Sequence, residues 1–167
     1  RYKYIWFKKI TYKISQNRLI KSQYSSCKYF TNIFLNIELK GENTAYETNK
    51  IIIKYLTESN LTPSKFIISS FRWDELKKFR NINKDVPIAI LVDSLYKIDN
   101  AIKLAKEINA VALNPNNKFI TNLIVKKIQS NNIKVYPYTI NTPMNIKRMK
   151  LMGVDAIITD FPERINK

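Results

Sequence analysis

Apolar and polar segments alternate along the chain from about residue 33 onward. Short apolar runs, each about the length of a strand, lie at residues 33–39, 66–71, 87–93, 110–114, 134–140 and 156–160. Runs such as IAILV are apolar at every position, which is typical of strands covered on both faces of a parallel sheet. The later runs follow one another at nearly constant intervals, as the strands of successive βα units do.

The segments between the runs have the spacing of helices. Apolar residues recur with helical spacing in two of them, through Ile98, Ala101, Ile102, Ala105 and Ile108 and through Ile120, Leu123, Ile124 and Ile128. Thr142 and Pro143 predict the start of another helix and Gly153 predicts its end. Further helices are expected over 43–57 and 73–80. The pattern therefore predicts six βα repeats with right-handed crossovers.

Two architectures fit this α/β pattern: a doubly wound open sheet and a (β/α)8 barrel. A complete barrel needs about 250 residues, whereas this chain has 167. Length alone favours the open sheet. In both architectures the functional site lies at the carboxyl ends of the strands.

The end of the first run places two charged side chains together. Glu38 and Lys40 are two residues apart on one strand, so they point to the same face. Such a pair suits a hard metal ion next to a phosphate, because the carboxylate binds the cation and the lysine neutralises phosphate oxygens. An ordinary structural ion pair is the alternative. The other runs end at Ser69, Ser70, Phe71, Asp93, Asn114, Tyr138, Thr139, Asn141, Thr159 and Asp160.

The strand ends are more specific when they are taken together. The segments NIELKG, ISSF, PIAILVD, AVALNP, YPYTIN and GVDAIITDFP resemble, in order and spacing, the C-terminal two-thirds of the glycerophosphodiester phosphodiesterase family. The resemblance covers about residues 33–165. It implies an incomplete (β/α)8 TIM barrel of about six βα units, of the PLC-like phosphodiesterase type, instead of the open sheet. It also implies lipid metabolism, since family members hydrolyse glycerophosphodiesters to glycerol 3-phosphate and an alcohol with a divalent cation.

The resemblance assigns roles to individual residues. Glu38 corresponds to a metal-binding carboxylate of the family, and Lys40 to its phosphate-contacting lysine. Phe71 corresponds to the apolar wall against the glycerol moiety, and Tyr138 stands where the family usually has tryptophan. Four more residues are interpreted as shaping or bracing the mouth of the barrel: Ser69, Thr139, Asn141 and Asp160. For Asp160, ligand binding is the alternative to bracing the turn before Pro162.

The composition excludes several kinds of active site. The chain has no histidine, one cysteine (Cys27) and two glycines (Gly41 and Gly153). Ser-His-Asp and Cys-His sites, histidine-bound zinc, Walker loops and GxGxxG turns are therefore excluded. The family's catalytic histidines and its E-x-D carboxylate pair are missing too. We expect no catalytic residue, and only weak binding of calcium or magnesium by Glu38 alone.

Basic residues are concentrated near the N-terminus. The net charge is +16, from 29 Lys and Arg against 13 Asp and Glu. Residues 1–37 contain no acid and many aromatic residues. We expect residues 1–32 to form a basic, aromatic-rich segment that contacts anionic membranes or single-stranded nucleic acid without a specific nucleic-acid target, and residues 33–167 to form the partial barrel. Lysine-rich drift in an A/T-biased genome is the first explanation of the charge, and a basic surface for nucleic acid or anionic lipid is the alternative.

Three functions remain open. In the first, the chain is a C-terminal phosphodiesterase fragment that is inactive alone and has open sheet edges, which an N-terminal polypeptide or self-association covers. In the second, it is a non-catalytic module that binds glycerophosphate weakly through Lys40. In the third, the N-terminal segment docks on an anionic surface. No apolar run there is long enough for a signal peptide or a membrane span, so a cytoplasmic location is expected.

Overall fold

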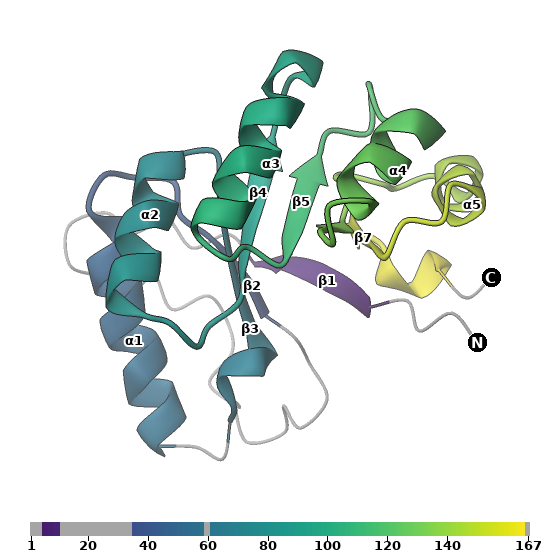
Figure 1. Cartoon of the computed structure of the whole chain (residues 1–167). Helices are drawn as coiled ribbons and strands as arrows, with labels where there is room; N and C mark the ends of the chain where they lie inside the picture. The colour runs from purple at the N-terminus through teal and green to yellow at the C-terminus, as the bar shows by residue number, and fades with distance from the viewer. Residues whose placement is uncertain (1–4, 11–34, 59–60, 166–167) are drawn as a thin grey trace.

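The computed structural model describes residues 5–10, 35–58 and 61–165 of the chain. Its strands form one parallel sheet (Figure 1), with the order β6-β5-β4-β3-β2-β1-β7. The strands are β1 Ile5–Ile10, β2 Leu35–Glu38, β3 Phe66–Ser70, β4 Ile88–Val92, β5 Ala112–Pro115, β6 Lys134–Val135 and β7 Ala156–Thr159. The strands expected from the apolar runs are all present, although β6 is much shorter than its run.

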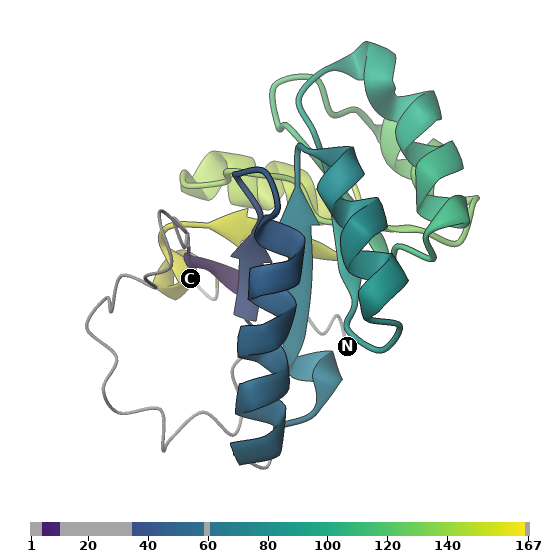
Figure 2. The same cartoon turned by 90° about the vertical axis from the view of Figure 1, so that its left-hand side faces the viewer.

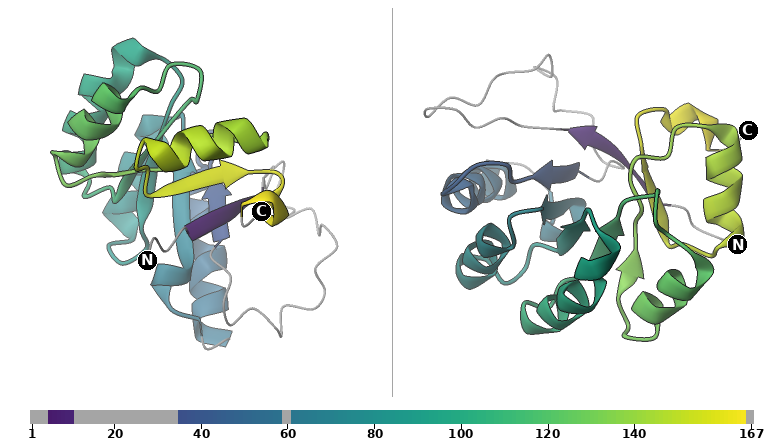
Figure 3. Two further views of the ribbon diagram at one scale, coloured as in Figure 1. Left: turned by 90° about the vertical axis from the view of Figure 1, so that its right-hand side faces the viewer. Right: turned by 90° about the horizontal axis from the view of Figure 1, so that it is seen from above.

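The α-helices of the described residues lie around the outside of the sheet, as the view from above in Figure 3 shows. They are α1 Thr44–Glu58, α2 Trp73–Ile82, α3 Ile98–Glu107, α4 Asn122–Gln129 and α5 Pro143–Leu151. Within the described ranges β7 is followed by a short 3-10 helix, η4 Pro162–Arg164, where the sixth repeat was expected to have an α-helix. Among these residues, no helix has the length and apolar character needed to cross a bilayer.

The two ends of the sheet meet, so the strands form a closed ring. β7 pairs with β1 on one side. On its other side, the segment that contains β7 is hydrogen-bonded to the segment that continues β6. These bonds run from Asp155 N to Val135 O (3.1 Å), from Ile158 N to Pro137 O (2.9 Å) and from Ile140 N to Ile158 O (2.8 Å). The barrel architecture is therefore confirmed, and the open sheet is excluded.

A strand from the N-terminal segment completes this ring. β1 lies between β2 and β7 and is parallel to both; Lys8 pairs with Leu35 on one side and with Thr159 on the other. Six repeats alone would leave β2 and β7 with free edges, and β1 covers both. The rest of the predicted segment 1–32 lies outside the described residues, so the domain boundary at residue 33 stays a prediction.

The strands bury side chains on both of their faces, which explains the continuous apolar runs. On the outer face, Ile90 and Leu113 belong to the large core between strands and helices. On the inner face, Ala89, Ala112 and Ala156 pack inside the barrel. Small side chains suit this position because the interior of a barrel narrows as the number of strands falls.

The sequence predicted where α5 begins and ends, and the structure confirms both positions. Thr142 Oγ1 accepts a hydrogen bond from Asn145 N (3.3 Å), and Pro143 occupies the first turn. Gly153 follows the helix with a φ of 70°. Glycine adopts this left-handed conformation without strain, so it ends the helix at little cost.

A buried carboxylate on α2 holds the start of α1, which runs alongside α2 (Figure 2). Glu75 is 0% exposed. Its carboxylate accepts hydrogen bonds from Asn43 N (3.0 Å), Ala45 N (2.9 Å) and Lys78 Nζ (2.8 Å). Burial by itself raises the pKa of Glu75, but these hydrogen bonds outweigh burial and leave its pKa below the ordinary glutamate value. The contact fixes the loop between Lys40 and α1.

We expect Glu75→Gln to lower the free energy of unfolding by about 1–3 kcal/mol, because a neutral amide replaces a buried charged acceptor. The lowered pKa means that the folded state holds the proton less tightly than the unfolded state. This contribution is therefore present at neutral pH and is lost as the pH falls through the folded-state pKa. Urea unfolding over a pH series measures both effects. Equal losses in Glu75→Gln and in the exposed control Glu47→Gln would contradict this role.

Proline at position 7 tests the closure of the ring by β1. Phe7→Pro removes a backbone N–H from a strand that is paired on both sides, so we expect it to cost about 1–3 kcal/mol and to promote self-association. Phe7→Ala is the matched control, because it removes the same ring and keeps the N–H. Thermal melting and sedimentation compare the two variants. Identical behaviour would show that β1 does not close the sheet.

Candidate functional site

Glu38 and Lys40 lie together at the carboxyl end of β2. Lys40 Nζ is 3.8 Å from Glu38 Oε2, and the two side chains are 46% and 8% exposed, respectively. The backbone of Leu39 between them is fixed on both sides: its N–H donates to Ser69 O (2.8 Å), and its carbonyl accepts from Ser70 Oγ (2.6 Å). Lys40 is therefore presented from a rigid strand end with an accessible ammonium group.

The hydroxyl of Ser70 connects two strand ends. It donates to Leu39 O and accepts from Arg72 N (2.9 Å), and Ser70 is 0% exposed. It thereby joins the segment that carries Lys40 to the turn that carries Phe71. The sequence shows Ser70 only as the last residue of a strand, because its connecting role depends on a contact with a different strand.

Phe71 and Tyr138 form an aromatic pair at the barrel mouth. Their ring centroids are 5.7 Å apart, and the ring planes meet at 81°, which is an edge-to-face contact. Tyr138 Oη donates a hydrogen bond to Val92 O (3.1 Å). The structure thus brings together two of the residues for which substrate contact was predicted.

The phenol of Tyr138 stays protonated well above neutral pH. Burial raises the pKa of Tyr138 to about 12; the negative charges of Asp93 and Glu38 add to this, and a hydrogen bond with Asn116 opposes it. Tyr138 is therefore a hydrogen-bond donor and an apolar surface, and it cannot serve as a base near neutrality. Because the charge of Glu38 contributes to the raised pKa of Tyr138, the carboxylate and the phenol lie in the same part of the mouth.

The end of β7 and the turn after it, within the segment GVDAIITDFP, are held by a network around Asn141. Asn141 Nδ2 donates to Asp160 Oδ2 (2.8 Å), and Asn141 Oδ1 accepts from Thr159 Oγ1 (3.2 Å). Arg164 Nη1 donates to Asn141 O (2.9 Å). The carboxylate of Asp160 is thus bound by the side chain of Asn141, whereas the sequence suggested that it binds the turn before Pro162.

The predicted mouth residues Ser69 and Thr139 have hydrogen-bond partners, whereas the buried side chain of Asn114 leaves one oxygen without a partner in the described part of the chain. Ser69 Oγ donates to Asn36 Oδ1 (2.9 Å), and Thr139 O accepts from Asn117 Nδ2 (3.0 Å). Asn114 is 1% exposed, and its side-chain oxygen has no hydrogen-bond partner within the described part of the chain. Asn114 is on the inner face, two residues beyond Ala112, so it lies just below the mouth.

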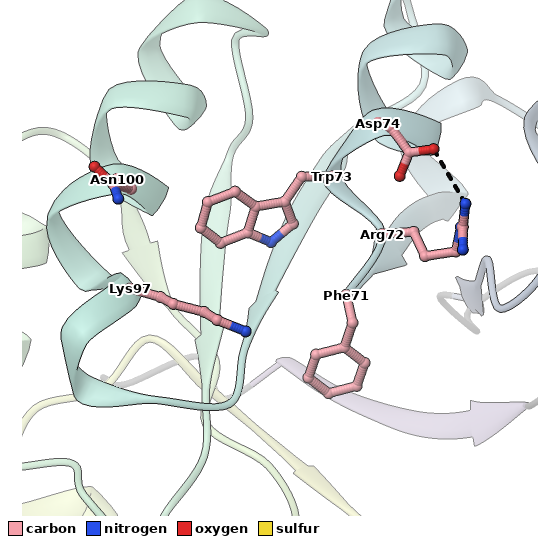
Figure 4. A pocket seen from close by; sticks show the side chains of 6 residues that line it. All are labelled: Phe71, Arg72, Trp73, Asp74, Lys97 and Asn100. Carbon is pink, nitrogen blue, oxygen red and sulfur yellow. Dashed lines mark hydrogen bonds and ion pairs between the residues drawn. The ribbon is translucent and has the colours of Figure 1, made fainter.

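A hollow of about 540 Å³ lies beside the mouth (Figure 4). It is lined by Phe71, Arg72, Trp73, Asp74, Lys97 and Asn100. Its charges are balanced, since Arg72 pairs with Asp74 (3.3 Å) and Lys97 pairs with Asp93 (2.8 Å). Phe71 borders both this hollow and Tyr138. Sequence reasoning missed the hollow because most of its residues are ordinary residues around helix starts.

The carboxylates at the mouth do not fit a divalent metal ion by themselves. Glu38 faces Lys40, and Asp93 is bound to Lys97. Across residues 5–10, 35–58 and 61–165, no group of three or more His, Cys, Asp or Glu is placed to hold a metal. Calcium needs about six to eight oxygen ligands and magnesium needs six. Glu38, which was predicted as a metal ligand, lacks the partners that such a site requires.

Comparison with protein families gives a direct match over most of the chain. Residues 31–164 match the Glycerophosphoryl diester phosphodiesterase family. The uncharacterized protein YqiK of Bacillus subtilis is 32% identical over 136 residues, covering 80% of this chain and 55% of YqiK. A glycerophosphodiester phosphodiesterase of Bacillus altitudinis is 29% identical over 140 residues, covering 82% of this chain and 56% of that protein. The chain spans about half the length of these relatives.

Solved structures share the fold. A phosphodiesterase of Oleispira antarctica, solved in complex with the product sn-glycerol 3-phosphate, superimposes with a TM-score of 0.68 at 22% identity, covering 80% of this chain and 53% of that chain. A glycerophosphodiester phosphodiesterase of Parabacteroides distasonis gives a TM-score of 0.66 at 24% identity, covering 83% of this chain and 58% of that chain.

A ring of parallel strands with outer helices, and with charged and aromatic residues at its carboxyl ends, defines this chain as a TIM-barrel-like protein. More specifically, the chain belongs to the glycerophosphoryl diester phosphodiesterase family. The resemblance seen in the strand ends is thereby confirmed. Members of this family are hydrolases of lipid metabolism and generally depend on a metal ion.

Tyr138→Phe provides a test of the mouth geometry. The phenol of Tyr138 should titrate at about pH 12, so the ultraviolet difference between wild type and variant should appear only in strongly alkaline solution. Loss of the hydrogen bond to Val92 should lower the free energy of unfolding by about 1 kcal/mol. A free tyrosine derivative provides the reference titration. If the difference follows that reference, the phenol is not buried as described.

Proposed function

We propose that the chain supplies the substrate-facing part of a glycerophosphodiester phosphodiesterase and binds the glycerophosphate group at the barrel mouth. The observation that carries this proposal is the accessible ammonium group of Lys40, together with the Phe71–Tyr138 pair. Phosphate oxygens bind lysine through charge, and the carbon atoms of glycerol need an apolar wall. Ser70 holds the segments that carry Lys40 and Phe71 at fixed relative positions.

Lys40 has capacity for a ligand. Its ammonium group is 3.8 Å from Glu38, which is too far for a hydrogen bond. A phosphate oxygen can therefore accept a hydrogen bond from Lys40 without displacing one to Glu38. The carboxylate of Glu38 repels the same phosphate, so the two charges oppose each other. The site should bind glycerol 3-phosphate weakly in the absence of further cations.

A relative supports this class of ligand. The Oleispira antarctica phosphodiesterase is described in complex with sn-glycerol 3-phosphate as its product. For the whole enzyme we propose the corresponding reaction, in which a glycerophosphodiester is hydrolysed to glycerol 3-phosphate and an alcohol. We include a calcium or magnesium ion in this reaction only where further carboxylates bind the ion together with Glu38.

Catalysis requires groups that this chain does not supply. The 167 residues contain no histidine. The pKa of Tyr138, about 12, keeps its phenol from accepting a proton near neutrality. We therefore propose that a complementary N-terminal polypeptide provides the acid and base groups. Without such a partner, the chain acts as a non-catalytic module for glycerophosphate.

Calorimetric titration with glycerol 3-phosphate tests the binding site. Lys40→Ala should weaken binding about 10-fold or more, since a hydrogen bond to a charged group contributes about 1.5–3 kcal/mol. Lys54→Ala is the control, because it removes an exposed lysine from α1. Identical titrations for wild type and Lys40→Ala would disprove the proposed role of Lys40.

Hydrolysis of glycerophosphocholine separates binding from catalysis. We expect no release of glycerol 3-phosphate by the 167-residue chain alone with calcium or magnesium present. Release that Lys40→Ala abolishes would contradict the proposed need for a partner and would still support the binding site. Release that survives Lys40→Ala would contradict both.

A further inference from the structure

α4 and α5 are successive helices on the outside of the barrel (Figure 3). Two hydrogen bonds join the carboxyl-terminal part of α5 and the turn after it to α4 and the loop before it: Arg148 Nη2 donates to Asn117 O (2.9 Å), and Gln129 Nε2 donates to Gly153 O (2.9 Å). The helices are neighbours on one side of the molecule in Figure 1. Six exposed residues make up what we call the α4–α5 face: Leu123, Lys126, Met144, Lys147, Arg148 and Leu151.

The apolar residues of the α4–α5 face are unusually exposed. Leu151, Leu123 and Met144 are 80%, 79% and 78% exposed, and they are the three most exposed aliphatic side chains of the described residues. Met144 and Leu151 are seven residues apart, so they lie on the same side of α5. Large exposed apolar side chains that gather on one surface indicate a partner for that surface.

The charge of this region has a single sign. Between Glu107 and Asp155 the sequence contains basic residues and no acidic residue. Lys126, Lys147 and Arg148 form no ion pair with any other residue in the described part of the chain. Some exposed lysines elsewhere are paired, as Lys77 is with Glu107 (2.7 Å). The α4–α5 face therefore presents cations that are free to meet an anionic partner.

We propose that the α4–α5 face docks on the surface of an anionic lipid bilayer. Its cations would contact lipid phosphates and carboxylates, and its aliphatic side chains would enter the interface between headgroups and acyl chains. A nucleic acid fits this surface less well, because single strands bind through aromatic side chains that stack on bases. Leucine and methionine side chains are stabilised more by contact with lipid hydrocarbon than by contact with nucleic-acid bases.

The location of the face connects it with the barrel mouth. α4 and α5 begin on the side where β5 and β6 end, and Leu123 and Met144 lie in their first turns. The edge of the α4–α5 face therefore reaches the rim of the mouth. Docking would bring that rim close to the lipid headgroups. The proposal does not depend on phosphate binding by Lys40, because it is measured without any glycerophosphate.

Vesicle co-sedimentation tests the proposal with the full chain. Vesicles of phosphatidylserine with phosphatidylcholine should bind the protein, and vesicles of phosphatidylcholine alone should bind it much less. The double variant Lys126→Gln, Lys147→Gln should weaken binding about fivefold for each cation removed. The triple variant Leu123→Ser, Met144→Ser, Leu151→Ser should weaken it about tenfold or more.

The matched control lies on α1, on the other side of the molecule in Figure 1. Lys50→Gln, Lys54→Gln and Ile53→Ser, combined in one variant, remove two exposed lysines and an exposed aliphatic residue there. This variant should bind vesicles as wild type does. Unchanged circular dichroism and melting temperature show that all variants are folded.

Three results would overturn the proposal. One is the absence of wild-type binding to anionic vesicles. Another is equal loss of binding in the α4–α5 and α1 variants, or no loss in either, because the bound surface would then lie elsewhere. The third is binding of a single-stranded oligonucleotide that the α4–α5 variants weaken while they leave vesicle binding unchanged, which would assign the face to nucleic acid.

Discussion

Hydrogen bonding along the edges of the parallel sheet is the constraint on which the rest of the structure depends. Every strand must be paired on both sides, or its free edge becomes a site of association. Main-chain bonds between Ile158 and the segment after β6 close one side of the ring, and β1 closes the other. Because the strands are parallel, their carboxyl ends all lie at one mouth of this ring, where Lys40 and Tyr138 lie.

Buried polar groups then fix the loops at this mouth. Ser70 ties the end of β2 to the turn after β3, and Glu75 anchors the start of α1. Neither group is exposed enough to contact a ligand directly. Both act by restricting the segments that flank Lys40, so that a flexible side chain starts from a fixed backbone. Such order favours the binding of a small ligand, since less entropy is lost when the ligand binds.

The sequence predicted most of the barrel but only part of its mouth. The strands from β2 to β7 have continuous apolar runs, and their helices have clear periodicity, so local pattern was sufficient. β1 was not predicted, because basic residues interrupt its short apolar stretch and its partners are distant in the sequence. Glu75 was missed for a related reason: a glutamate in an amphipathic helix resembles a surface residue until its helix packs against α1. Strand spacing placed Glu38 and Lys40 together, as they are in the structure, and family resemblance assigned Phe71 and Tyr138 to the mouth; their roles in binding stay predictions.

The position of β1 has a consequence for any partner that restores a complete barrel. Such a partner must insert its strands between β2 and β7, and β1 already occupies both of these edges. Assembly is therefore a strand exchange: one set of backbone hydrogen bonds must break before another forms. The strand β1 therefore competes with any such partner for these two edges, and its own pairing keeps the barrel closed when no partner is present.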